Sequence, residues 1–467
     1  MDNPTPTTRQ KALALNLDGR TYGTFAEIGG GQEVVRAFFA AGGAAGTVAK
    51  SISAYDMAVS DSMYGPAKRY VSRERLEAML EHEFSQLVKE LGEQRGGSKC
   101  FFAFANTVAT RRFRSAGEGR GWLGVRFQAE PHAEPSQVII HAHLLDGEAA
   151  YEQEALGALG VNLVYGAFFT QGSPERLIAS LLDDLSRERV EIDMVKFSGP
   201  AFAGVDNCLM SLQLVEQGMT DAAMFTAVGE VVQPSEVLYK KAILVERGSF
   251  RPATKLTLDL LARSMERFSS DPAVRERGTP IVLAEMTLRN LTAGAGARHE
   301  DFLARADILR ALGFDVLISR FELYYELADY LAAYTDGPLG LAIGLPAVRL
   351  LIDETYYKNL AGGLLESAGR LFKRSVKAYV YPTRDPVSGR VVTWDDMQVP
   401  HPWEHLHKLL TELGHVVPIR PSDESYLAID TPDVLARIEK DDPSWERMVP
   451  SKVAEIIKAN RLFRRAG

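Results

Sequence analysis

Charged residues interrupt three strand-like apolar runs near their carboxyl ends, and their types suit acid–base or metal chemistry. The residues are Lys196, Glu246 and Glu285, and the runs that hold them are 192–199, 242–248 and 281–286. Because the carboxyl ends of parallel strands line the ligand crevice of an α/β sheet, we expect these side chains to converge on one site. The lysine could act as a base or nucleophile, and the carboxylates could hold Mg²⁺ or divide the acid and base roles. An internal ion-pair network among the same residues is the alternative.

Three arginines follow these runs and suit a bidentate grip on a phosphate or carboxylate. They are Arg247, Arg251 and Arg289. Together with the carboxylates they predict a small anionic molecule as the partner of the site, with Mg²⁺ or a nucleotide as the candidate cofactor.

A glycine triplet, Gly29, Gly30 and Gly31, separates a strand-like segment from an apolar-periodic helix that starts at Gln32. Such a junction aims unpaired N–H groups at a position where a phosphate could bind. The G-x-G-x-x-G spacing of dinucleotide-binding folds is absent. A tight turn that needs positive φ is the alternative interpretation.

Lys50 and Ser51 follow a second loop of small residues and superficially resemble the end of a P-loop. Ala49 stands where that motif needs a glycine before the lysine, so a Walker loop is not expected. The two residues could instead assist an anion site formed with the glycine triplet. A surface lysine after a turn is the alternative.

The histidines offer two further groups that could bind a transition metal. His141 and His143 lie two apart on a predicted strand and so point the same way. Another three, at positions 401, 405 and 407, cluster at a predicted helix start. Neither group has a cysteine or aspartate at a supporting sequence spacing.

The elements that must position these residues alternate between strand and helix from about residue 151 onward. Strands are predicted at 161–169 and 190–197 and helices at 174–186 and 208–217, and the alternation continues to about residue 381. This spacing is typical of βα units with right-handed crossovers. We therefore predict an α/β fold with a mostly parallel sheet, doubly wound, with a closed barrel as the alternative. The predicted parts are an N-terminal α/β lobe with glycine-rich loops (1–150), a βα-repeat core (151–382) and a C-terminal extension (383–467) that ends in a helical tail.

Composition narrows the functional classes. The 467 residues carry a net charge of −8, which argues against a general nucleic-acid binder. The two cysteines lie far apart, and the first ten residues contain no apolar core of a signal peptide. The longest apolar stretches, 155–169 and 339–352, fall below the roughly 20 residues needed to span a bilayer. We therefore expect a cytoplasmic protein without a membrane partner.

Four stretches, 25–29, 46–56, 196–200 and 362–367, resemble a bacterial family of unassigned function. Members of that family carry the labels nicotinate-nucleotide adenylyltransferase or TonB-dependent receptor. An adenylyltransferase of that kind would show an H-x-G-H phosphate motif near its N-terminus. A receptor barrel would need a signal peptide and many alternating strands. Because this sequence shows neither pattern, the resemblance transfers no catalytic residue and only directs attention to nucleotides.

The functional hypothesis is an enzyme that acts on a nucleotide or another phosphorylated small molecule by group transfer or hydrolysis. A non-catalytic scaffold that self-assembles is the alternative, and a ligand-sensing regulator is a third possibility. A tyrosine-rich helix at 324–334 and the C-terminal tail would provide the contact surfaces of a homo-oligomer.

Overall fold

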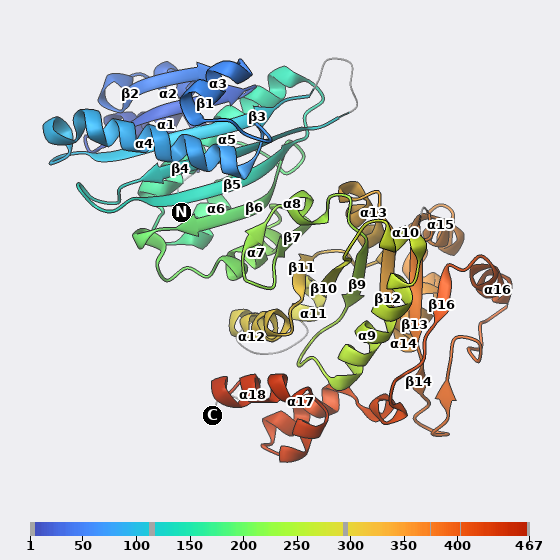
Figure 1. The fold of residues 1–467 in the computed structure, drawn as a ribbon. Helices are drawn as coiled ribbons and strands as arrows, with labels where there is room; N and C mark the ends of the chain where they lie inside the picture. The colour runs from blue at the N-terminus through green and yellow to red at the C-terminus, as the bar shows by residue number, and fades with distance from the viewer. Residues whose placement is uncertain (1–4, 112–116, 293–297, 374, 402, 465–467) are drawn as a thin grey trace. The chain divides into compact units, whose positions relative to one another are not determined.

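The computed structural model describes residues 5–111, 117–292, 298–373, 375–401 and 403–464. The chain divides into two compact units, Met1–Asp221 and Ala222–Gly467, here called unit 1 and unit 2. Each is built around its own β-sheet with packed helices, which confirms the predicted α/β class (Figure 1). The expected divisions at residues 150 and 382 each fall inside a unit.

The sheet of unit 1 has six strands in the order β2-β1-β3-β4-β5-β6. They are β1 (Thr21–Gly29), β2 (Val48–Ala54), β3 (Cys100–Ala109), β4 (Gly119–Phe127), β5 (Ser136–Leu144) and β6 (Val190–Ser198). β1 pairs in parallel with β2 and β3, whereas the remaining pairs are antiparallel. The strand that carries Lys196 is therefore an antiparallel edge strand, which corrects the parallel one expected from its apolar run. A short apolar run does not distinguish the two cases.

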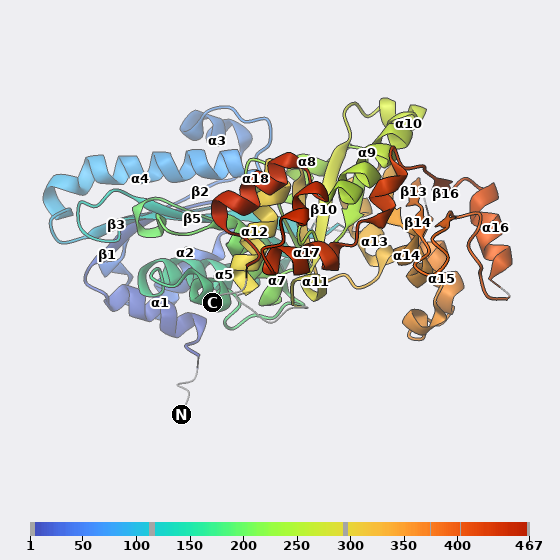
Figure 2. The same cartoon turned by 90° about the horizontal axis from the view of Figure 1, so that it is seen from below.

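Helices cover both faces of this sheet. They are α1 (Thr8–Leu17), α2 (Glu33–Ala41), α3 (Met57–Tyr64), α4 (Arg73–Arg95), α5 (Ala149–Phe169), α6 (Pro174–Ser180) and α7 (Asn207–Glu216). Figure 2 shows α4 along one face, with α1, α2 and α5 on the other. The main apolar core lies on the α2 and α5 side, where Phe25, Phe102 and Phe104 meet Val34 and Phe38.

The first helix, α1, precedes the first strand of unit 1. Its start is fixed by a capping box, in which the Thr7 side chain accepts the Gln10 amide and the Gln10 side chain accepts the Thr7 amide. Alanine and leucine then continue the helix, because both have high helix propensity.

Helix α5 corrects the strand predicted at 161–169. Two glycines, Gly157 and Gly160, lie inside α5. A Cβ at Gly160 would come within 2.4 Å of the Val34 side chain of α2, and one at Gly157 would come within 3.0 Å of Glu33. These glycines let two helices approach closely, so they mark helix packing and not a helix end.

The sheet of unit 2 has eight strands in the order β16-β13-β12-β9-β10-β11-β7-β8. They are β7 (Ala222–Phe225), β8 (Val231–Val232), β9 (Ile243–Arg247), β10 (Ile281–Thr287), β11 (Asp315–Ser319), β12 (Leu339–Gly344), β13 (Val376–Tyr381) and β16 (Val416–Pro418). The strands from β16 to β11 pair in parallel, and β7 and β8 add an antiparallel edge. Counted along the chain, the parallel strands follow the doubly wound order 3-2-1-4-5-6. The open sheet is therefore confirmed over the barrel.

The connections of unit 2 are mostly helical, and a short hairpin of β14 (Thr383–Arg384) and β15 (Val391–Val392) follows β13. The helices are α8 (Pro234–Leu238), α9 (Lys255–Ser269), α10 (Pro272–Arg275), α11 (Leu288–Thr292), α12 (Arg298–Ala311), α13 (Tyr324–Tyr334), α14 (Leu345–Leu351), α15 (Gly363–Leu371), α16 (Glu404–Glu412), α17 (Thr431–Glu439) and α18 (Ser451–Asn460). The last two confirm the helical tail. Among the described residues, none of the helices combines the length and the apolar character that a membrane span requires.

Candidate functional site at the carboxyl edge of the unit 2 sheet

Strands β9 and β12 are neighbours in the unit 2 sheet, and the chain leaves them toward opposite faces. After β9 it forms α9, whose Leu260 and Leu261 pack with Leu244 on one face. After β12 it forms α14 and α15, whose Val348 and Leu364 pack on the other face. In open α/β sheets, loops that diverge in this way flank the position where ligands bind.

Glu246 lies near the carboxyl end of β9 at this position. Across the sheet it pairs in register with Ala284 of β10 and Ala342 of β12, both small, apolar and buried. Its Oε2 atom is buried and has no hydrogen-bond partner among the described residues. Burial raises the pKa of Glu246 well above its ordinary value, which favours the protonated carboxyl. The arrangement supplies a neutral acid in an apolar setting.

Glu285, predicted to share this site, lies on the opposite face of the sheet. Register places it beside Arg247, and alternate residues of a strand point to opposite faces. Its two oxygens accept hydrogen bonds from Arg247 Nε and Nη2 at 2.7 and 2.9 Å, and Oε1 also accepts one from the Ser319 hydroxyl at 2.6 Å. The Arg247 guanidinium also lies 4.6 Å from the centre of the Tyr324 ring. Glu285 and Arg247 therefore form a buried ion pair, as in the alternative interpretation, but Glu246 takes no part in it.

The loop after β9 is held in an unusual conformation. Phe250 is buried and has a φ of 48°, in the left-handed region that residues other than glycine rarely adopt. Arg305 of α12 donates to the Ser249 carbonyl at 3.2 Å, and Arg251 Nε lies 2.6 Å from Asp301 Oδ1. Strained backbone of this kind persists only where its surroundings over-determine it, and it clusters at functional sites.

The predicted arginines therefore divide into different environments. Arg247 is committed to Glu285, and Arg251 is partly exposed beside Asp301. Arg289 is exposed on α11. Arg251 of the loop and Arg305 of α12 both contact Asp301 of α12, so two positive charges lie beside one negative charge.

The first turn of α9, which lies next to this loop, already has internal partners. Thr254 caps the helix and accepts the Thr257 amide, and the Lys255 amide donates to the Met448 carbonyl at 2.9 Å. A phosphate cannot use these amides while the partners stay in place.

A polar cluster that the sequence does not indicate lies on the face of the unit 2 sheet that α9 covers. Asp259 of α9 accepts the Tyr381 hydroxyl at 2.5 Å and the Ser422 amide at 2.9 Å. Asp259 sits in an amphipathic helix sequence, where an aspartate normally indicates the solvent face, so no sequence signal marked it.

Lys196 belongs to the other unit. It lies on β6 of the unit 1 sheet, whereas Glu246 and Glu285 lie in the unit 2 sheet. The prediction that Lys196, Glu246 and Glu285 lie along one sheet edge is therefore wrong, because β6 belongs to a different sheet from β9 and β10.

The glycine triplet of unit 1 does precede a helix, but an internal carboxylate occupies the helix start. Glu27 Oε1 and Oε2 accept the Val34 and Val35 amides of α2 at 3.1 and 3.4 Å, and Asn106 donates to Oε1 at 3.2 Å. Gly29 has a φ of 79°, as the turn interpretation requires. Burial raises the pKa of Glu27 to about 8, against the opposing effect of these hydrogen bonds.

Lys50 and Ser51 do not join the glycine triplet. Lys50 pairs across the sheet with Thr24 and makes an ion pair with Glu83 of α4 at 2.6 Å, which places it on the α4 face. Glu27 lies on the α2 face, so the alternation of side chains along a strand separates the two. Ser51 is exposed on β2, which is an edge strand.

The two predicted histidine groups differ in whether their side chains lie together. His401 contacts Glu404 at 2.7 Å, whereas the His407 ring stacks on Trp394 and its Nε2 contacts the Trp394 carbonyl at 3.0 Å. The second group therefore takes separate partners. His141 and His143 instead lie together, as described below.

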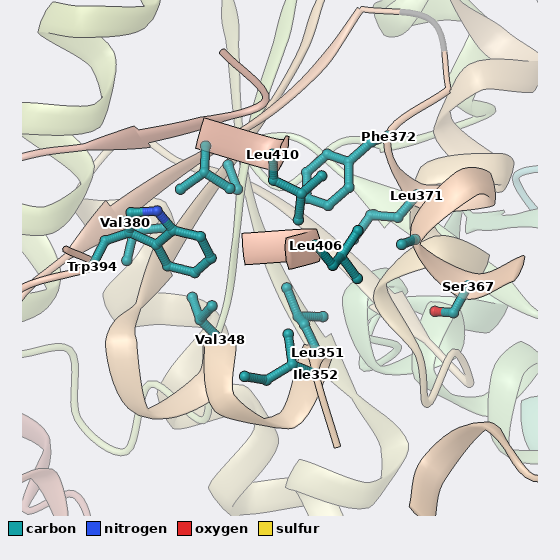
Figure 3. A pocket seen from close by; sticks show the side chains of 13 residues that line it. Val348, Leu351, Ile352, Ser367, Leu371, Phe372, Val380, Trp394, Leu406 and Leu410 are labelled. Atoms are coloured by element: carbon teal, nitrogen blue, oxygen red, sulfur yellow. The ribbon is translucent and has the colours of Figure 1, made fainter. Parts of the chain in front are cut away.

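An apolar cavity in unit 2 lies among α14, α15, α16 and β13 (Figure 3). Its volume is about 20 Å³, which is room for about one water molecule. Trp394, Leu406 and Phe372 are among its lining residues, and Ser367 is the polar one. Without convergent polar groups, this cavity is a packing defect of the core and not a ligand site.

Comparison with known proteins defines no family for this chain. No protein-family model matches it, and no curated protein matches its sequence. Three solved structures are similar to part of the chain: the competence/damage inducible protein CihA from Agrobacterium tumefaciens, a competence-damaged protein (CinA) superfamily protein from Enterobacter cloacae, and a competence or damage-inducible protein from Enterobacter asburiae. Their identities are 16%, 15% and 14%, they cover 35%, 36% and 35% of this chain, and the matches span 97%, 95% and 98% of their own chains. Each TM-score is 0.25, a value that supports no inference about fold or activity.

Proposed function

We propose that unit 2 is a catalytic α/β unit that binds a phosphorylated or nucleotide-like small molecule where β9 and β12 end, and that Glu246 transfers a proton there. The observation that carries the proposal is the buried Oε2 atom of Glu246, which has no hydrogen-bond partner among the described residues and stands where open α/β sheets bind ligands. A buried polar group without a partner lowers stability. Carboxyls with a strongly raised pKa are concentrated at sites where they act as acids or bases.

The charges beside the loop that follows β9 suit an anionic ligand. Arg251 of the loop after β9 and Arg305 of α12 share Asp301 of α12, which leaves one positive charge in excess. An ionised Glu246 would repel a phosphate, whereas the protonated carboxyl favoured by burial can donate a hydrogen bond to it. In group transfer or hydrolysis, Glu246 would act as a general acid that gives its proton to the leaving oxygen. Such an acid contributes about 10²–10⁴-fold in rate.

The test combines ligand binding with turnover. The thermal stability of the full chain is measured with nucleotides and sugar phosphates, with and without Mg²⁺, and each stabilising compound is then assayed for release of phosphate. Glu246→Gln keeps the size of the side chain and removes the acid. We expect it to retain binding within a few-fold and to lose at least about a hundredfold in turnover.

Glu412→Gln is the matched control, because Glu412 is exposed on α16 and makes a long ion pair with Lys408 at 3.8 Å. It should behave as the wild-type protein. Stabilisation by none of the compounds, or equal turnover of the two variants, would contradict the proposal. Binding without turnover in the wild-type protein would favour a ligand-sensing regulator.

A further inference from the structure

Two histidines and one aspartate meet within the unit 1 sheet, far from Glu246 in the sequence and in a different sheet. His141 and His143 lie on β5, and Asp193 lies on the neighbouring strand β6. His141 Nδ1 is 2.6 Å from Asp193 Oδ1, and His143 Nε2 is 3.0 Å from Asp193 Oδ2. One ligand atom from each residue lies within 4.8 Å of the others.

A β-bulge places Asp193 beside the histidines. His141 pairs with Met194 and Ala142 pairs with Ile192, so Asp193 is the extra residue on β6. Ile192 and Ala142 belong to the apolar core on the opposite face. Bulges re-aim a side chain at the expense of regular pairing, and they occur preferentially next to functional sites.

Burial and ring packing fix the geometry of this group. The side chains of His141 and Asp193 are 3% and 1% exposed, whereas His143 is 18% exposed and forms the open side. The His141 ring lies 4.8 Å from the Trp122 ring and 5.0 Å from the His143 ring, centre to centre. These contacts hold both imidazoles toward the carboxylate.

We propose that His141, His143 and Asp193 form a binding site for a divalent transition-metal ion of the zinc class. Two imidazole nitrogens and one carboxylate are typical ligands of Zn²⁺, and three protein ligands leave a coordination position open for water or an anion. Bonds of about 2.0–2.1 Å in tetrahedral geometry separate ligand atoms by about 3.3 Å. The His141 and Asp193 atoms therefore need to move apart by less than 1 Å when a metal replaces the proton between them.

The test uses the full chain after chelator treatment and dialysis. Zn²⁺ binding is measured by calorimetry, and Co²⁺ is added as a probe whose visible absorption reports a four- or five-coordinate site. We expect one tightly bound ion per chain, together with a rise in melting temperature on adding Zn²⁺. His143→Gln should weaken Zn²⁺ binding at least tenfold and remove the Co²⁺ band, and it should fold because His143 is the most exposed of the three.

His82→Ala is the matched control, because His82 is an exposed histidine of the same unit on α4. It should leave metal binding unchanged. Asp193→Asn gives a second variant that keeps the size of the carboxyl. The proposal is overturned if stoichiometric zinc and the Co²⁺ band are missing from the wild-type protein, or if His143→Gln and His82→Ala weaken binding equally. The group would then be a buried, hydrogen-bonded ion pair that stabilises the bulge.

Discussion

Replacing Arg247 tests whether Glu285 serves structure instead of chemistry. Arg247→Met keeps an apolar stem and removes the guanidinium, which donates at 2.7 and 2.9 Å to Glu285. The Glu285 side chain is 0% exposed and would keep only the Ser319 hydroxyl among the partners described above. Breaking a buried ion pair by removing one member costs about 3–5 kcal/mol, because the other charge stays buried without compensation. For a unit of this size, about 2–4 °C of melting temperature corresponds to each kcal/mol, so we expect a loss of about 6–20 °C.

The assay is thermal unfolding followed by tryptophan fluorescence, because three of the four tryptophans lie in unit 2. Lys408→Met is the control, since its ion pair with Glu412 is exposed and should contribute under about 1 kcal/mol. The double variant Arg247→Met/Glu285→Met should recover most of the loss, because buried pairs are often replaceable by apolar residues. A loss below about 1 kcal/mol for Arg247→Met would refute this reasoning and return Glu285 to the list of catalytic candidates.

Further predictions concern buried carboxyls and a glycine. The pKa of Glu27 rises from 4.5 to about 8 on folding, so stability should fall by about 5 kcal/mol as pH rises across that window, at 1.36 kcal/mol per unit. Glu27→Gln should lose this dependence, as measured by urea unfolding at pH 5 and pH 8; a wild-type stability that rises with pH would contradict it. Glu246→Gln should likewise become more stable relative to the wild-type protein as pH rises above 4.5, because burial raises the pKa of Glu246, and a constant difference would count against this. Gly29→Ala should lower the unfolding midpoint far more than Gly43→Ala. Both glycines have positive φ, so both substitutions introduce backbone strain. A Cβ at Gly29 would also lie 2.2 Å from the Val108 carbonyl oxygen, whereas one at Gly43 has no neighbour closer than 3.6 Å. Equal losses of stability in the two variants would show that the strain of the positive φ, and not the clash with Val108, determines the effect.

The sequence located the ends of β9 and β10 correctly but could not place their side chains on faces. Glu246 and Glu285 both stand near strand ends, yet Glu246 pairs with Ala284 and Glu285 with Arg247. A shift of one residue between the two strands would have put both carboxylates on the same face. Register between parallel strands depends on how the intervening helix packs, and no local pattern records it.

Two other features could not be predicted from the sequence, because each depends on contacts between residues that are distant in the chain. The strand predicted at 161–169 is part of α5; a glycine seldom continues a helix, and only the approach of α2 explains the place of Gly160 in α5. Asp193 is about fifty residues from the histidines and reaches them through a bulge, so sequence spacing could not predict the cluster. The strand and helix alternation, by contrast, is a local property, and it correctly predicted the doubly wound sheet of unit 2.

The close packing of α5 on α2 has a consequence for Glu27. Gly157 and Gly160 face Glu33 and Val34, which begin α2, and the Val34 amide is one of the donors to the Glu27 carboxyl. Any larger side chain on these two turns of α5 would push the start of α2 outward and lengthen that bond. A substitution in α5, more than a hundred residues later in the chain, would thus change the pKa of Glu27 on β1.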